Sequence, residues 1–178
     1  LARQQSDDMR AQLVEAGVRI ILGHGRLDDH HSLVVATGPG GTDFDRVEAD
    51  TLVVAVGASP RELPTACPDG ERILTWTQLY DMKALPEHLI VVGSGVTGAE
   101  FASAYMNLGA QVTLISSRDQ VLPGEDRDAA AVIERVFTRG GMTVLSKSRA
   151  DTVERVGDGV VVTLSDGRVV EGSHCLMA

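Results

Sequence analysis

Residues 89–100 read Leu-Ile-Val-Val-Gly-Ser-Gly-Val-Thr-Gly-Ala-Glu, a glycine-rich stretch directly after a short apolar run. The four apolar residues predict a buried strand, and the spacing of Phe101, Ala102, Tyr105 and Leu108 predicts a helix after the last glycine. A glycine turn between a strand and a helix places a dinucleotide pyrophosphate at the N-terminus of that helix.

The three glycines of this turn are expected to have different tasks. Gly93 permits the tight turn, Gly95 lets the backbone approach the phosphates, and Gly98 lets the new helix pack closely on the strand. Gly109 ends the helix before a second strand at residues 112–115. This order of strand, turn, helix and strand favours a dinucleotide site over a chance cluster of glycines.

Composition limits the other classes of function. The chain has 178 residues, of which 43% are hydrophobic and 23% charged, as expected for a protein with one good core or two small ones. A net charge of -9 argues against a nucleic-acid surface, so an anionic ligand must be held locally. No apolar run has the length of a membrane span. Without a signal peptide, the expected location is the cytoplasm.

The cysteines and the chain ends also carry information. Cys67 and Cys175 lie far apart and outside any CxxC or CxxxxC pattern, which indicates neither a redox pair nor a disulfide framework. The sequence starts within a predicted helix and stops within a predicted strand at 175–178. We therefore expect it to be a segment of a longer polypeptide.

The first third of the chain is expected to contain a helix and several strands. A helix is predicted over residues 3–16 and a strand over 18–22, followed by an alternating stretch at 32–48 that suggests a hairpin. Residues 49–60 form a continuous apolar run that ends in a glycine turn closed by proline. Such a run predicts a strand buried on both faces.

The rest of the chain shows two different periods. Residues 61–84 read as an irregular connection with a short helical turn at 78–82, and we place a domain boundary near residue 84. An amphipathic helix at 128–139 and a strand at 142–145 continue the alternation of strand and helix, which predicts a parallel sheet with right-handed crossovers. From residue 151 the period changes to two, which predicts a three-stranded antiparallel meander.

Jointly, these motifs resemble the FAD-dependent pyridine nucleotide-disulfide oxidoreductases, the family of lipoamide dehydrogenase, glutathione reductase, mercuric reductase and soluble transhydrogenase. Residues 23–25 resemble the strand end that meets the flavin adenine, and 55–60 resemble the family's Ala-Thr-Gly motif, with Val56 in place of the threonine. Residues 72–80 and 93–98 are most similar to lipoamide-dehydrogenase-like NAD(P)H quinone reductases, which lack the redox disulfide.

The resemblance implies a fold and a function. Residues 1–84 would be part of an FAD-binding domain, and residues 85–178 a Rossmann-like NAD(P)-binding domain truncated at its last strand. Hydride would pass from NADP(H) or NAD(H) to FAD, and electrons then to a quinone-type acceptor, in a homodimeric parent. The alternatives are a dihydrolipoamide dehydrogenase, which needs a CxxxxC pair N-terminal to this sequence, and a nucleotide-binding fragment without turnover.

The position that normally selects between the nicotinamide cofactors reads Ser116-Ser117-Arg118. An acidic residue there binds the ribose hydroxyls of NAD, and none is present, so NADPH should be accepted. Two hydroxyls and a guanidinium can bond a 2′-phosphate. The alternative is a solvated surface arginine that pairs with Asp119.

Other site residues are transferred from the resemblance. Glu100 would lie beside the nicotinamide and pair with a lysine of the flavin domain, or be a plain helix former. Val96 stands where glutathione reductase-like members carry a tyrosine gate, and the backbone of Ala150 would line the adenine pocket unless it is only a turn residue. His24 would contact the adenine through its backbone or be merely hydrogen-bonded.

The candidate catalytic residue is therefore Glu100, and no metal site is predicted, because His30 and His31 lack the spacing of ligands. The candidate cofactor contacts are His24, Gly25, Ala55, Val56, Gly57, Gly93, Ser94, Gly95, Val96, Thr97, Gly98, Glu100, Ser116, Ser117, Arg118 and Ala150.

Overall fold

The computed structural model describes residues 2–178, which divide into two compact units with the division between residues 57 and 58. In chain order, the elements are α1 (Ala2–Glu15), β1 (His24–Leu27), β2 (Ser32–Thr37), the 3₁₀ turn η1 (Pro39–Gly41), β3 (Asp43–Glu48), β4 (Ile73–Thr75), α2 (Trp76–Leu79), β5 (His88–Val92), α3 (Val96–Asn107), β6 (Gln111–Ile115), α4 (Arg127–Arg139), β7 (Thr143–Leu145), β8 (Ala150–Val156), β9 (Gly159–Leu164), β10 (Val169–Gly172) and β11 (His174–Met177).

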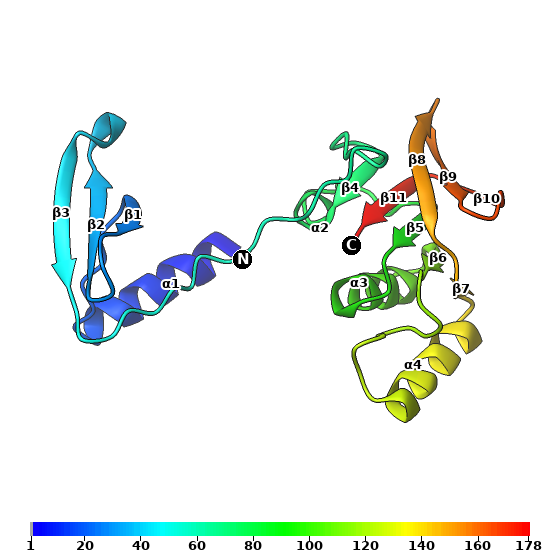
Figure 1. The fold of residues 1–178 in the computed structure, drawn as a ribbon, viewed down its shortest axis with the longest axis horizontal. Coiled ribbons are helices and arrows are strands. Elements are labelled where there is room, and N and C mark those ends of the chain that lie inside the picture. The colour runs from blue at the N-terminus through cyan, green and yellow to red at the C-terminus, as the bar shows by residue number, and fades with distance from the viewer. Residues whose placement is uncertain (1) are drawn as a thin grey trace. The chain divides into compact units, whose positions relative to one another are not determined.

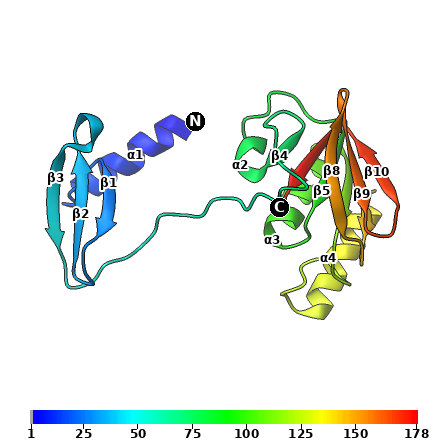
Figure 2. The same ribbon diagram turned by 45° about the horizontal axis from the view of Figure 1, so that its top comes forward.

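The first unit contains helix α1 and a three-stranded antiparallel sheet in the order β1-β2-β3 (Figure 2). The predicted hairpin is confirmed, with Val35 of β2 opposite Asp45 of β3 and Gly25 of β1. Strand β1 is an addition to the predicted hairpin. The turn runs through Gly38, Gly40 and Gly41, whose φ angles of 78°, 75° and 67° favour glycine.

Two strand predictions in this unit are wrong. Residues 18–22 and 49–60 lie outside every strand of the described chain, and the side chains of Val53 and Val56 are 84% and 88% exposed. A strand buried on both faces needs neighbours on either side to pair its backbone and cover its side chains. No described strand pairs with either segment, so neither forms a strand despite its apolar composition.

The second unit is built on a five-stranded sheet in the order β4-β11-β5-β6-β7 (Figure 1). All its neighbouring strands run parallel, and Val91 of β5 lies opposite Leu114 of β6 and Leu176 of β11. The predicted parallel sheet is therefore confirmed. Strand β4 lies within residues 61–84, for which an irregular connection is predicted, so that prediction is wrong at β4. A three-residue strand is too short to show a period in the sequence.

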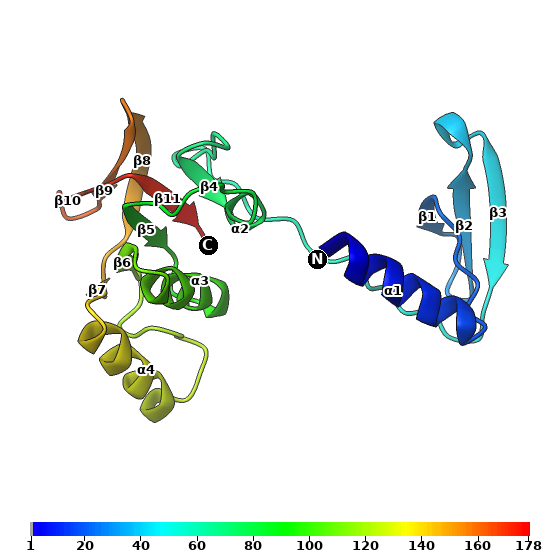
Figure 3. The same cartoon turned by 180° about the vertical axis from the view of Figure 1, so that it is seen from behind.

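Both faces of this sheet are covered, which produces three layers. Helices α3 and α4 lie on one side and the antiparallel sheet β10-β9-β8 lies on the other (Figures 1 and 3). The predicted meander is thus confirmed. Buried side chains on the helix side include Leu74, Leu89, Val91, Ala99, Ala102, Val112, Leu114, Phe137 and Leu176. Those on the meander side include Ile73, Ile90, Ile115, Val153, Val160, Val162, Leu164 and Cys175.

The helices begin where local hydrogen bonds allow it. The Asp126 carboxylate accepts from the backbone N–H groups of Asp128 and Ala129, which starts α4 one residue before the predicted helix. Helix α2 begins earlier than the predicted turn, because the Gln78 side chain accepts from the Thr75 N–H at 2.8 Å. None of the described helices has the length and apolar character needed to cross a membrane.

The compact units do not coincide with the predicted cofactor domains. Strand β4 and residues 58–84 belong to the unit that holds the parallel sheet. A compact unit is defined by its internal packing, whereas the boundary near residue 84 concerns which segment binds which cofactor. That boundary stays a prediction.

His88, at the start of β5, links this strand to β6 and to Ser173, the residue between β10 and β11. Its Nε2 lies 2.9 Å from the Thr113 hydroxyl, and its backbone exchanges hydrogen bonds with the Ser173 hydroxyl. Burial lowers the pKa of His88 below 6.5. The pKa of His174 is also lowered, first by burial and then by Arg72.

These lowered pKa values make stability depend on pH. Since the unfolded histidine titrates near 6.5, the stability contributed by neutral His88 is complete above that pH and declines as the pH falls below it. We expect urea unfolding, followed by the fluorescence of Trp76, to show a lower midpoint at pH 5.5 than at 7.5. His88→Gln should flatten this dependence, whereas His30→Gln on the other unit should not. An unchanged profile in His88→Gln would contradict the assignment.

Candidate dinucleotide-binding site

The candidate site lies at the carboxyl edge of the parallel sheet. A cavity of about 250 Å³ opens there. It is lined by residues at or just after the ends of several strands: Met177 of β11, Gly93 after β5, Ser117 after β6, and Arg149 and Ala150 after β7. Strands β6 and β7 extend to one side of β5 and β11 lies on the other. The chain order therefore reverses at β5, and ligands of open α/β sheets bind at such a switch point.

The glycines of the turn meet different surroundings. Gly93 has a φ of 114°, and a Cβ on it would lie 2.4 Å from the carbonyl oxygen of Ala178. A Cβ on Gly98 would lie 2.0 Å from the carbonyl oxygen of Gly93, so helix α3 packs directly on the turn. A Cβ on Gly95 meets open space. These surroundings fit a dinucleotide, because the one unfilled position is where the pyrophosphate would approach the backbone.

A buried pair of hydroxyls joins the turn to the end of β6. Ser94 Oγ donates to Ser116 Oγ at 2.6 Å, and Ser116 Oγ accepts from the N–H of Arg118 at 3.2 Å. The same oxygen lies 3.2 and 3.3 Å from the carbonyls of Arg118 and Gln120, to which it can donate. Ser116 is therefore fully buried and bonded within the protein, and it holds the loop instead of presenting a hydroxyl to a nucleotide.

Ser117 and Arg118 remain exposed at this edge. Asp119, the alternative partner of Arg118, instead pairs with Arg127 at 3.3 Å. Arg118 has no ion pair with any other residue in the described range 2–178. Its guanidinium is consequently available to an anion, whereas the nearest carboxylate in sequence is engaged.

Three side chains in the first turns of α3 are exposed, although Gly98 and Ala99 between them are buried. Thr97, Val96 and Glu100 are exposed, and the last two border an apolar cavity of about 540 Å³ that also touches Ile133 and Phe137 of α4. Nothing in the described chain pairs with Glu100, so its role beside the nicotinamide stays a prediction.

In the first unit, the structure brings two of the predicted flavin markers together. Gly25 of β1 and residues Ala55 and Val56 line one cavity of about 310 Å³. His24 and Gly57 are exposed and do not line it. These markers form only part of a site, and they stay candidate cofactor contacts.

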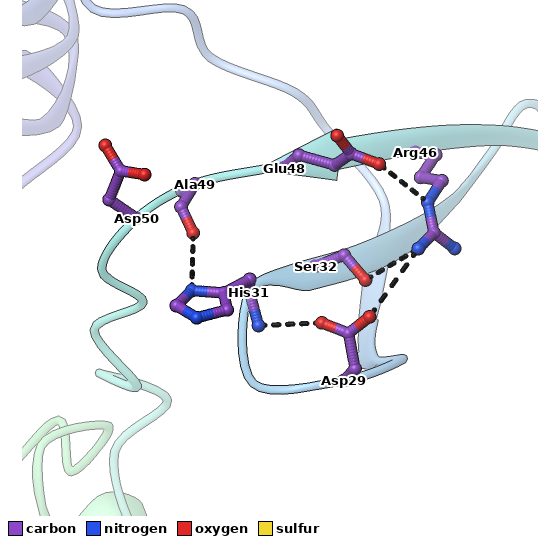
Figure 4. A pocket seen from close by; sticks show the side chains of 7 residues that line it. All are labelled: Asp29, His31, Ser32, Arg46, Glu48, Ala49 and Asp50. Carbon is purple, nitrogen blue, oxygen red and sulfur yellow. Dashed lines mark hydrogen bonds and ion pairs between the residues drawn. The ribbon is translucent and has the colours of Figure 1, made fainter.

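A cluster around Arg46, which no sequence motif indicates, lines another cavity of this unit, of about 430 Å³ (Figure 4). Arg46 donates to the Ser32 hydroxyl at 2.9 Å and pairs with Asp28, Asp29 and Glu48. The backbone N–H of His31 chiefly lowers the pKa of Asp29. One guanidinium thus holds three carboxylates, and the cluster is a surface ion-pair network that ties β3 to the β1–β2 turn.

In the described part of the chain, no three His, Cys, Asp or Glu side chains gather in a group that could hold a metal ion. Cys67 and Cys175 are both free. Burial strongly raises the pKa of the Cys175 thiol, which makes it an inert core side chain.

A parallel sheet with a glycine turn and helix N-terminus at its switch point defines the Rossmann class of dinucleotide-binding folds. The family model described as "Pyridine nucleotide-disulphide oxidoreductase" matches residues 2–178. The chain belongs to this family.

Individual relatives agree with this assignment. The chain is 55% identical over 183 residues to an NAD(P)H dehydrogenase (quinone) of Mycobacterium tuberculosis, and the match covers 99% of the chain and 37% of that relative. It is 31% identical to a dihydrolipoyl dehydrogenase of Zymomonas mobilis, covering 100% of the chain and 39% of the relative. The solved structure of LpdA from M. tuberculosis matches with a TM-score of 0.86 and 53% identity, over 99% of the chain and 39% of LpdA. The chain thus spans under two fifths of the length of these relatives.

The surroundings of Gly98 and Gly95 predict that substitution of Gly98 lowers the stability of the fold, whereas substitution of Gly95 weakens nucleotide binding. Gly98→Ala would press its methyl group against the Gly93 carbonyl, and we expect it to lower the free energy of unfolding by about 2 kcal/mol or more. Gly95 has φ −67° and ψ −174°, which other residues adopt, so Gly95→Ala should change stability little yet weaken nucleotide binding. Urea unfolding and calorimetric titration with NADP⁺ would measure both. A Gly95→Ala variant that binds normally would refute the pyrophosphate placement.

Proposed function

We propose that the full-length gene product is an FAD-dependent NAD(P)H oxidoreductase that passes a hydride from the nicotinamide to the flavin and then electrons to a quinone-type acceptor. The open position at Gly95, between the Gly93 turn and the N-terminus of α3, is the observation that carries the proposal. The relative at 55% identity supports the quinone acceptor through its name, NAD(P)H dehydrogenase (quinone).

Bound FAD would supply the redox chemistry, and the residues of this chain would position the reactants. The turn at Gly93 and Gly95 would hold the pyrophosphate, and the cavity beside Ala150 would take the adenosine. Gly25, Ala55 and Val56 would form part of the flavin site. Glu100 is the proposed positioning residue beside the nicotinamide. Homodimeric assembly and a cytoplasmic location belong to the same proposal.

A dihydrolipoyl dehydrogenase is the second candidate, because a relative with that name is 31% identical over the whole chain. Such an enzyme needs a redox CxxxxC pair, which would lie N-terminal to this sequence. The greater identity to the quinone-named relative favours the first candidate.

Stopped-flow reduction of the flavin in the full-length gene product would test the proposal. We expect rapid reduction by NADPH, reoxidation by a benzoquinone, and no turnover with lipoamide. Lipoamide turnover combined with a strict requirement for NADH would instead establish the second candidate. Flavin that neither nucleotide reduces would exclude both.

Arg118 provides a separate test of cofactor preference. Because its guanidinium is exposed and unpaired within the described chain, Arg118→Gln should raise the KM for NADPH about ten-fold while leaving that for NADH nearly unchanged. Arg139→Gln, an exposed arginine at the end of α4, is the matched control. Equal changes for the two nucleotides would show that Arg118 does not contact the 2′-phosphate.

A further inference from the structure

The loop after β7 lies against the loop after β6 through backbone hydrogen bonds. Ser116 N–H donates to the Leu145 carbonyl at 2.9 Å, and Ser148 N–H returns a bond to the Ser116 carbonyl at 2.8 Å. Lys147 N–H donates to the Arg118 carbonyl at 2.7 Å. These bonds use only backbone atoms of Lys147 and Arg118, so both charged side chains are left free while their backbones are held together.

Three cations are gathered on these two loops of an acidic chain. Arg118, Lys147 and Arg149 are all exposed, and within residues 2–178 none of them forms an ion pair. The neighbouring Arg168 differs, because Asp166 pairs with it at 2.6 Å while it donates to the Ser148 hydroxyl. Unpaired positive charge is therefore concentrated at the carboxyl edge of β6 and β7.

Two further observations point from this cluster to a ligand. Arg149 and Ser117 line the same cavity as Gly93, although they come from different loops. Lys147 has a φ of 53°, a left-handed conformation that a non-glycine side chain rarely adopts and that its surroundings must impose. The hydrogen bonds donated by the backbone N–H groups of Lys147 and Ser148 hold this strained conformation. Strained residues of this kind cluster at functional sites.

We propose that Lys147 and Arg149 complete, with Ser117 and Arg118, a recognition site for a phosphomonoester on the adenosine 2′ position, an inference that rests on the proposed nucleotide-binding function. A phosphate dianion needs several donors and positive charges, and one arginine on the β6 loop supplies only part of them. The β7 loop supplies Arg149, which lines the same cavity, and Lys147, which lies two residues before it in the chain. Preference for NADP(H) would then depend on two loops instead of one.

Binding of 2′,5′-ADP and of 5′-AMP to the full-length gene product isolates this contact, because the two probes differ only in the 2′-phosphate. We expect Lys147→Gln and Arg149→Gln each to weaken 2′,5′-ADP binding about ten-fold, and Lys147→Gln, whose side chain does not line the adenosine cavity, to change 5′-AMP affinity by less than about two-fold. Rising ionic strength should weaken 2′,5′-ADP binding more in the unmodified protein than in the double variant. Arg139→Gln, four residues before β7 begins, is the control for loss of one positive charge.

Two failures can be told apart. If the unmodified protein binds neither probe, the proposed nucleotide-binding function fails, and this inference with it. If it binds 5′-AMP but both variants keep their affinity for 2′,5′-ADP, or lose both probes equally, only the inference is overturned. Unchanged flavin reduction by NADH in Lys147→Gln would show independently that the nucleotide site has remained intact.

Discussion

The site depends on the close approach of α3 to the end of β5. A Cβ on Gly98 would lie 2.0 Å from the Gly93 carbonyl, so only hydrogen at this position lets the helix start so near the strand. Small buried residues, Ala99 and Ala102, continue the approach along α3. The N-terminus of the helix is thereby set at the carboxyl edge of the sheet, where its free N–H groups and dipole favour an anion.

This contact reaches the neighbouring strands through Ser94. Its hydroxyl bonds to Ser116 inside a dry interior, and an unpaired hydroxyl there would be costly, so the two serines restrain each other. Ser116 in turn holds the backbone of Arg118 and accepts the N–H of Ser148. Hydrogen bonds thus connect the turn at Gly93–Gly98 with the loops after β6 and β7. The position of each of these segments therefore depends on the others.

The spacing of glycines and apolar residues in short stretches of sequence predicted much of this architecture. Such patterns gave wrong predictions where the structure depends on pairing between strands that are distant in sequence. The glycine spacing at 93–98 carries its own geometry, and the period-two stretch after residue 151 reports an exposed face and a buried face. The apolar run at 49–60 has the composition of a central strand but no described neighbour. Likewise, the burial of Ser116 and the approach of Lys147 follow from the pairing of β6 with β7, which no short stretch of sequence encodes.

The electrostatic potential at this edge depends on which charged side chains remain unpaired there, and not on the net charge of the chain. The net charge of -9 would repel a nucleotide at long range, but salt screens charges separated by more than roughly 10 Å. Near the cavity, Asp119 is engaged by Arg127 and Asp166 by Arg168. Two ion pairs thus withdraw the carboxylates of Asp119 and Asp166, while Arg118, Lys147 and Arg149 form no ion pair within residues 2–178. A chain with a negative net charge can therefore have a basic rim at this cavity, because the ion pairs around it determine the local charge independently of the net charge.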